Sequence, residues 1–149
     1  MDKFTACMKF IALWEWGNKP DGGYTNDPVD PGGETKYGIS KRQYPHLDIK
    51  NLKLADAHEI YKRDYWNSCG ADNLSYPLCL AVFDTAINLG QDDSDKWLKE
   101  TRDFRAFLDL RVAKYHRLVA RTPKMVKYLK GWLNRVADIK KFADANVIV

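Results

Sequence analysis

The sequence is poor in cysteine and histidine, with three of each in 149 residues. The cysteines, Cys7, Cys69 and Cys79, are irregularly spaced, and none pairs with a histidine at the spacing of a zinc finger. We therefore expect buried free thiols, no disulfide framework, no metal site and no cofactor.

Long apolar runs are also missing. The longest, Leu78–Phe83, is far shorter than the ~18 residues that a membrane-spanning helix needs, so we expect no span. The N-terminus lacks the basic segment followed by an apolar one that marks a secretory signal. With 45% hydrophobic and 30% charged residues, no internal repeat and no linker, residues 1–149 have the composition of one folded domain with a buried core.

Acidic residues are scarce in the second half of the chain. Residues 76–149 carry 14 Lys and Arg against 9 Asp and Glu, whereas residues 1–75 carry 10 against 11, and the net charge is +4. A basic surface suits an anionic partner such as nucleic acid, phospholipid or a cell-wall polymer, and charge alone does not choose among them. A solvated helix face explains the same excess without any partner.

The first third of the chain predicts a helix followed by a glycine-rich region. Residues 2–16 place apolar side chains at helical spacing, and the same series extended by four reaches Glu15. Residues 17–38 contain six glycines and three prolines, which exclude a helix there. This region predicts a loop with a small β-hairpin, and Thr35–Ser40 is its best strand.

The rest of the chain predicts helices. One runs from about residue 54 to residue 65, and a second, capped by Ser75, runs to Asn88 with Gly90 as its stop signal. This second helix is apolar on nearly every face and is therefore expected in the middle of the fold. After an acidic turn, Gln91–Asp95, two more helices lie on either side of Thr122-Pro123. The fold class predicted is α+β, mainly α, with a small Gly-rich β-hairpin region.

A carboxylic acid at the end of the first helix meets the glycine-rich turn. The acid is Glu15, and the turn carries Asp27, Asp30 and Glu34. Burial of a glutamic acid among tryptophans favours its protonated form, as a general acid for a glycosidic oxygen requires. A second acid in a wetter site could hold a water or stabilise an oxocarbenium-like centre, so this layout is typical of a glycosidase cleft.

At these residues the sequence resembles the glycoside hydrolase family 108 N-acetylmuramidases, lysozyme-like enzymes of bacteriophages and bacteria. The family motif Asp-Pro-x-Asp-x-Gly-Gly-x-Thr-x-x-Gly-Ile matches residues 27–39 at every named position. Four later blocks are also similar to that family: residues 60–61, 65–66, 82–90 and 131–136. The resemblance implies a single lysozyme-like muramidase domain over residues 1–149.

The catalytic glutamate of that family begins a Glu-Gly-Gly motif, and two residues compete for its place. Glu15 ends an amphipathic helix, but Trp16 then replaces the first glycine and an insertion follows; an ungapped alignment places Asp21 over the motif instead. We favour Glu15, because Asp21 lies in a loop without burial. The resemblance further implies that Asp30 acts on the opposite side of the sugar ring and that Thr35 holds the catalytic water or orients the glutamate.

The remaining candidate residues are expected to bind substrate. Aromatic side chains offer faces on which sugars stack, while Asp84 and Asn88, four apart on the buried helix, could bond the sugar or support the β-hairpin from below. The predicted substrate-binding set is Tyr24, Tyr37, Asp84, Asn88 and Trp132. Each of the acids in the loop could instead be an ordinary turn residue, and most of the aromatic rings could be core.

The function implied is hydrolysis of the β-1,4 bond between N-acetylmuramic acid and N-acetylglucosamine in bacterial peptidoglycan, by a phage or prophage endolysin. The alternative is a catalytically inactive peptidoglycan-binding module of the same fold. We expect a monomer with no nucleic-acid partner, because no nucleic-acid-binding motif is present. The expected route is synthesis in the bacterial host cytoplasm and action on the cell wall, in the periplasm, after release through a pore. The basic half of the chain would then hold the enzyme on a negatively charged wall.

Overall fold

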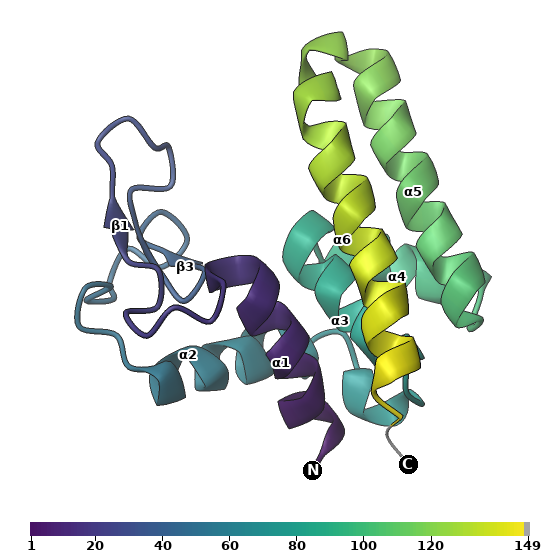
Figure 1. Cartoon of the computed structure of the whole chain (residues 1–149), viewed down its shortest axis with the longest axis horizontal. Helices are drawn as coiled ribbons and strands as arrows, with labels where there is room; N and C mark the ends of the chain where they lie inside the picture. The colour runs from purple at the N-terminus through teal and green to yellow at the C-terminus, as the bar shows by residue number, and fades with distance from the viewer. Residues whose placement is uncertain (148–149) are drawn as a thin grey trace.

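A computed structural model describes residues 1–147 and consists of a helical body with a small sheet beside it (Figure 1). The helices are α1 (Lys3–Trp16), α2 (Leu54–Tyr61), α3 (Leu78–Leu89), α4 (Gln91–Glu100), α5 (Phe104–Arg121) and α6 (Val126–Ala145). Three short helical turns, η1 (Lys62–Trp66), η2 (Ala71–Asn73) and η3 (Pro123–Met125), join them. None of the helices in residues 1–147 combines the length and apolarity of a membrane span. The predicted fold class is confirmed: α+β, mainly α.

Helix α1 matches the helix predicted for residues 2–16. It begins after Asp2, whose Oδ1 accepts a hydrogen bond of 2.9 Å from the Thr5 amide, and ends at Gly17, which has a positive φ of 62°. A side-chain acceptor is a standard start signal of a helix, and a left-handed glycine is a standard stop signal. The last turn of α1 therefore presents Glu15 beside the glycine-rich region.

The sheet is antiparallel, with the order β1 (Thr25–Asn26), β2 (Glu34–Lys36) and β3 (Ile39–Ser40). Thr35 lies opposite Thr25 on one side and opposite Ser40 on the other. The prediction of one strand over Thr35–Ser40 is wrong, because Tyr37 and Gly38 have positive φ values of 51° and 74°. Two successive left-handed residues reverse the chain, so they form the turn between β2 and β3.

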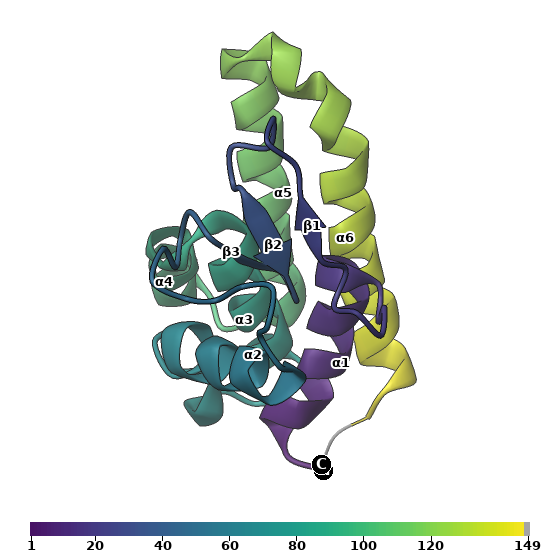
Figure 2. The ribbon, with the colours of Figure 1, turned by 90° about the vertical axis from the view of Figure 1, so that its left-hand side faces the viewer.

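Helix α3 lies in the middle of the helical body and contacts α1, α4 and α5 (Figure 2). The six residues from Leu78 to Phe83 are all buried, which confirms the predicted central helix. The cap is different from the prediction: the Ser75 carbonyl, not its side chain, accepts the Cys79 amide at 3.0 Å. All three cysteines are buried and free, as expected, and the Cys7 and Cys79 sulfurs are 4.0 Å apart.

The segment Gln91–Asp95 belongs to α4 and is not the turn that was predicted. Gly90 separates α3 from α4, while Asp92 and Asp93 lie in the first helical turn, where negative charge is favourable. The buried Ser94 hydroxyl donates to the Val82 carbonyl at 3.1 Å and so joins the two helices. Because of these interactions the acidic segment Gln91–Asp95 forms a helix and not a loop.

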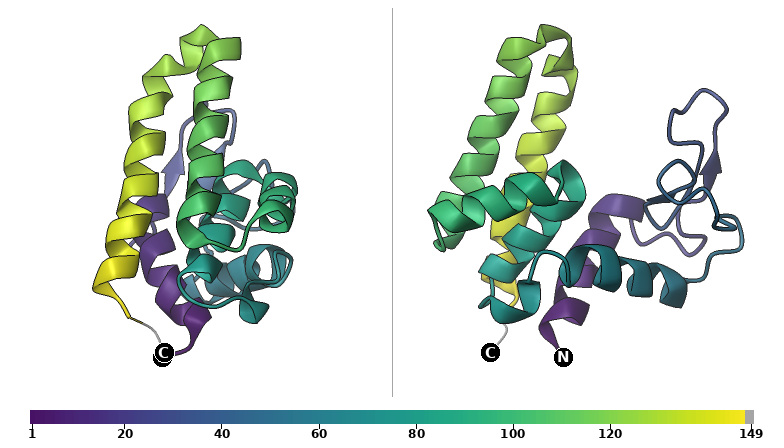
Figure 3. Two further views of the ribbon diagram at one scale, coloured as in Figure 1. Left: turned by 90° about the vertical axis from the view of Figure 1, so that its right-hand side faces the viewer. Right: turned by 180° about the vertical axis from the view of Figure 1, so that it is seen from behind.

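Helices α5 and α6 form an antiparallel pair that extends well beyond the rest of the body (Figure 3). The sheet and this pair stand on opposite sides of the C-terminal end of α1 (Figure 1). The end of α1 thus lies where the two regions of the molecule meet.

Candidate active site

Glu15 occupies the meeting point of the sheet and the helical body. Its side chain is 21% exposed, so it is partly sheltered but can still reach a ligand. A Cβ atom added to Gly38 would lie 3.0 Å from the Glu15 Cβ and 3.2 Å from its Oε2. The Tyr61 hydroxyl lies nearer still, so the turn between β2 and β3 packs directly against Glu15 and Tyr61, and only glycine fits there without displacing them.

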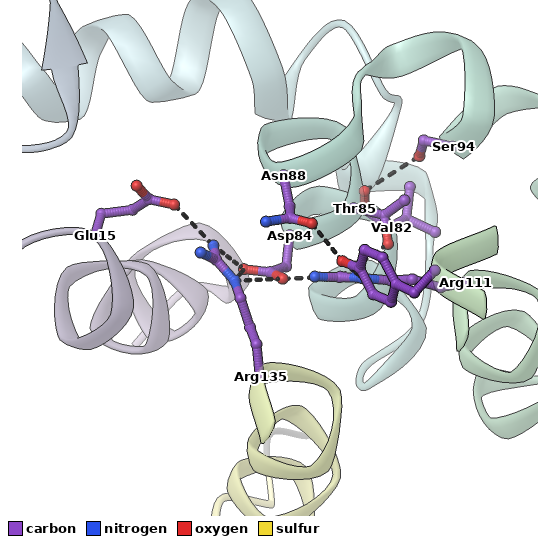
Figure 4. Close-up of polar contacts among 9 residues, drawn as sticks. Glu15, Val82, Asp84, Thr85, Asn88, Ser94, Arg111 and Arg135 are labelled. Atoms are coloured by element: carbon purple, nitrogen blue, oxygen red, sulfur yellow. Dashed lines mark hydrogen bonds and ion pairs between the residues drawn. The ribbon is translucent and has the colours of Figure 1, made fainter. Parts of the chain in front are cut away.

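One carboxylate oxygen of Glu15 is bound by Arg135 of α6. The Arg135 Nη2 donates to Glu15 Oε1 at 2.8 Å and also to Asp84 Oδ1 at 2.7 Å (Figure 4). The Arg135 Nε lies 3.1 and 3.2 Å from the two Asp84 oxygens. This guanidinium group links the acid on α1 to the central helix α3.

A second arginine binds Asp84 from the other side. Arg111 of α5 places Nη1 2.8 Å from Asp84 Oδ2 and 3.1 Å from the Thr85 hydroxyl. Its Nε donates to the Tyr115 hydroxyl at 2.9 Å, and that hydroxyl donates to Asn88 Oδ1. The network thus runs from Glu15 through Arg135, Asp84, Arg111 and Tyr115 to Asn88.

The charges of this network stabilise one another. Burial alone would raise the pKa of Asp84, but the charges and hydrogen bonds of Arg135 and Arg111 outweigh burial and hold it below its usual range. Burial likewise disfavours the Arg135 cation, but Asp84 and Glu15 outweigh this effect and raise its pKa above the ordinary value. Asp84 and Arg135 are therefore both ionised over the whole physiological range.

Three of the acids in the glycine-rich region are exposed turn residues, whereas Glu34 is half-buried in β2. Asp21, Asp27 and Asp30 each accept, through Oδ1, the backbone amide two residues further along, at 2.8 to 2.9 Å. The segment between β1 and β2, which carries Asp27 and Asp30, rises away from the end of α1 (Figure 1). None of these three acids makes a hydrogen bond or ion pair with Glu15 within residues 1–147. The Thr35 hydroxyl has a weak bond of 3.5 Å to the Gly33 carbonyl.

Two predicted sugar contacts are wrong. Asp84 is completely buried and bound by two arginines, so it cannot touch a glycan. Tyr37 is 8% exposed, and its ring packs edge-on against Trp16 at 5.4 Å between centroids, so it belongs to the core. Asn88, in contrast, is half-buried, and its amide nitrogen points to the side on which Glu15 lies (Figure 4).

The other two aromatic residues predicted to contact a sugar, Tyr24 and Trp132, both interact with neighbouring side chains. The Tyr24 hydroxyl donates to Glu34 Oε2 at 2.8 Å. Trp132 stacks on Tyr115 at 4.9 Å and on Tyr128 at 5.8 Å between ring centroids. Trp132 therefore supports the tyrosine of the polar network, and contact of either residue with a sugar stays a prediction.

Arg111 and Arg135 are the functional residues that the sequence analysis missed. Arg111 continues an apolar stripe of α5, and a cation at such a position needs a buried anion. The buried helix α3 carries such an anion, Asp84. A search for this complementary pair of buried charges would have found Arg111, whereas Arg135 resembled the solvated lysines of its helix. Within residues 1–147 no group of acids, histidines or cysteines is arranged to hold a metal ion.

Comparisons with known proteins give one family match and one similar solved structure. The family model for glycosyl hydrolase 108 matches residues 15–90, which begin at Glu15 and end after α3. The solved structure of SagA from Brucella abortus is similar in fold, with a TM-score of 0.72 and 24% sequence identity. That similarity covers 95% of this chain and 94% of SagA. No curated protein sequence gives a significant match.

Proposed function

Because the chain belongs to the glycosyl hydrolase 108 family, we propose that it is an N-acetylmuramidase, with Glu15 as its general acid. The substrate of this proposal is bacterial peptidoglycan, and the bond is the β-1,4 linkage between N-acetylmuramic acid and N-acetylglucosamine. The observation that carries the proposal is a partly exposed carboxyl group, held by an arginine, at the junction of two regions of the fold. The proposed setting is a phage or prophage endolysin acting at the cell wall.

In the proposed reaction Glu15 gives a proton to the glycosidic oxygen as the bond to the anomeric carbon breaks, and water then bonds that carbon and returns a proton to Glu15. Its Oε1 is bound by Arg135, whereas Oε2 lies on the side of Gly38 and makes no hydrogen bond within residues 1–147. A carboxyl group fixed through one oxygen and open through the other can meet a substrate oxygen in a defined direction. The Asn88 amide, open toward the same side, would bond an acceptor group of the sugar.

The decisive experiment compares Glu15→Gln with Asp21→Asn. Each enzyme is incubated with purified Gram-negative sacculi, and new reducing ends and the mass of the released fragments are measured. General acids typically contribute 10²- to 10⁴-fold to the rate, so Glu15→Gln should lose at least about 100-fold. Asp21→Asn should retain wild-type activity, because Asp21 only caps a turn. Fragments ending in reducing N-acetylmuramic acid support the muramidase; loss of activity in Asp21→Asn alone would move the acid to the loop.

An inactive wall-binding module is the second candidate. One observation favours it: Asp30, the predicted second acid, is engaged with the Gly32 amide in an exposed turn. Co-sedimentation with sacculi, measured beside reducing-end release, separates the two candidates. Binding by the wild type without new reducing ends would favour the inactive module and contradict the muramidase proposal.

A further inference from the structure

Asp84 is the point at which two chains of hydrogen bonds meet beneath the proposed active site. It is completely buried, so it cannot contact a glycan. Both of its oxygens are bound by arginines that come from different helices, Arg111 from α5 and Arg135 from α6. Whatever Asp84 contributes to catalysis must therefore pass through these two side chains.

The first branch leads to Glu15. The Arg135 Nη2 is shared between Asp84 Oδ1, at 2.7 Å, and Glu15 Oε1, at 2.8 Å. The guanidinium group also lies 5.8 Å from the Trp14 ring, which limits its movement on the α1 side. Asp84 thus fixes the arginine that fixes Glu15.

The second branch leads to Asn88. Arg111 holds the Tyr115 hydroxyl through Nε, and that hydroxyl donates to the Asn88 carbonyl oxygen. Since the carbonyl oxygen is engaged there, the amide nitrogen of Asn88 is turned toward the side of Glu15 (Figure 4). The two groups that remain available to a substrate, one acid and one amide, are oriented from the same buried carboxylate.

Asp84 also controls the charge that Glu15 meets. Asp84, Arg111 and Arg135 together carry one positive charge, which would be two without Asp84. The groups facing Glu15 are Arg135 from α6, Asp84 behind it on α3, and Tyr61 from α2. Tyr61 stays neutral, because burial raises its pKa, and its hydroxyl donates to the Tyr37 carbonyl at 2.9 Å.

We propose that Asp84 is a positioning residue that orients Glu15 through Arg135 and Asn88 through Arg111 and Tyr115. It also halves the positive charge beside the acid. This inference rests on the proposed function, in which Glu15 donates the proton. Each branch can be broken alone: Arg135→Gln breaks the first, and Tyr115→Phe, which keeps the ring, breaks the second.

The test is the pH profile of reducing-end release from purified sacculi, with kcat and KM, for the wild type and four variants at equal folded fraction. In Asp84→Asn the net positive charge beside Glu15 doubles, so the alkaline limb of kcat/KM should move to lower pH. At pH 7 its kcat/KM should fall at least about tenfold, the lower end of a general-acid effect. In Arg135→Gln a cation is lost, so the limb should move to higher pH. Tyr115→Phe should raise KM about threefold or more without moving the limb, because the hydroxyl that joins Arg111 to Asn88 is lost with both of its hydrogen bonds.

The control is Ser94→Ala, which removes a buried hydrogen bond between α4 and α3 outside the network. If Asp84 acts as proposed, Ser94→Ala lowers the stability of the fold but leaves the pH profile of kcat/KM unchanged. Equal profiles in all variants, or shifts of the same sign in Asp84→Asn and Arg135→Gln, would overturn the inference while leaving the muramidase standing. If Asp84→Asn does not fold, the contrast between Arg135→Gln and Tyr115→Phe decides in the same way. A wild type that releases no reducing ends refutes the proposed function itself.

Discussion

Three acids of the sheet region, residues 17–52, and two acids of the helical body are held in opposite ways. In the sheet region Asp21, Asp27 and Asp30 bond amides only two residues away, and all three are exposed. In the helical body the bonds of Arg135 reach across 51 residues to Asp84 and 120 residues to Glu15. The first arrangement is local and solvated, whereas the second is buried and depends on the whole fold.

This difference separates the residues of the glycine-rich motif from the residues that bind Glu15. The glycine-rich motif shapes a turn that packs Gly38 against Glu15. The side chain that binds Glu15 is Arg135 of helix α6, which is itself bound by Asp84 of α3, and both lie far along the chain. The sheet region therefore supplies shape around the acid, and the helical body supplies its electrostatic environment.

The largest effect on stability is expected when a charge is removed from the helical body. Asp84→Asn leaves Arg111 without an anion and Arg135 with Glu15 alone, and breaking such a buried pair typically costs about 3–5 kcal/mol. Asp30→Asn in the sheet region should cost less than about 1 kcal/mol, because an Asn side chain makes the same turn. Urea unfolding followed by circular dichroism measures both. Equal costs for the two substitutions would contradict the contrast between the regions.

A smaller effect is expected where the two regions touch. Gly38→Ala places a Cβ 3.0 Å from Glu15 in a residue with φ of 74°, so it should cost about 1–3 kcal/mol and reduce activity. The matched control is Gly131→Ala in α6, where nothing lies within 4 Å of the new Cβ. That change should raise stability by about 0.5–1 kcal/mol, because alanine favours a helix. Thermal unfolding and reducing-end release follow the pair; unchanged activity in Gly38→Ala would count against the tight packing at Glu15.

Wall binding should depend on the end of the α5–α6 pair. No acid occurs between residues 110 and 137, and three exposed lysines lie near the turn: Lys124, Lys127 and Lys130. Their replacement by glutamine should weaken sedimentation with sacculi a few-fold in low salt and reduce its sensitivity to added salt. A variant with three exposed lysines outside the α5–α6 pair changed to glutamine is the control: Lys19, Lys50 and Lys53. Sedimentation with sacculi that does not change with salt concentration would refute this role of the three lysines.

The smallest effect concerns pH and His58 on α2. Burial lowers the pKa of His58 below its ordinary value of 6.5, so the unfolded chain takes up a proton first as the pH falls. Its contribution to stability is present above pH 6.5 and is lost as the pH falls through the lowered value. His58→Gln should therefore flatten the decline of the urea midpoint between pH 7 and 5. His116→Gln, at an exposed position on α5, should leave the decline as in the wild type.

The sequence alone predicted the parts of the fold that depend on neighbouring residues. Helix α1 with Glu15 in its last turn, the glycine-rich hairpin, and the central helix α3 all follow from spacing and turn residues. The resemblance to glycoside hydrolase family 108 came from the same local signals and is confirmed. The role of Glu15 as the acid stays a prediction that the geometry supports.

Tertiary structure decided the environment of that acid. It turned Gln91–Asp95 into a helix, buried Asp84 between Arg111 and Arg135, and left Asp30 in an exposed turn. Periodicity and turn propensity act over a few residues, so the sequence reports them directly. The pairing of charges 27, 51 or 120 residues apart arises only when packing excludes water and forces each buried ion to find a partner.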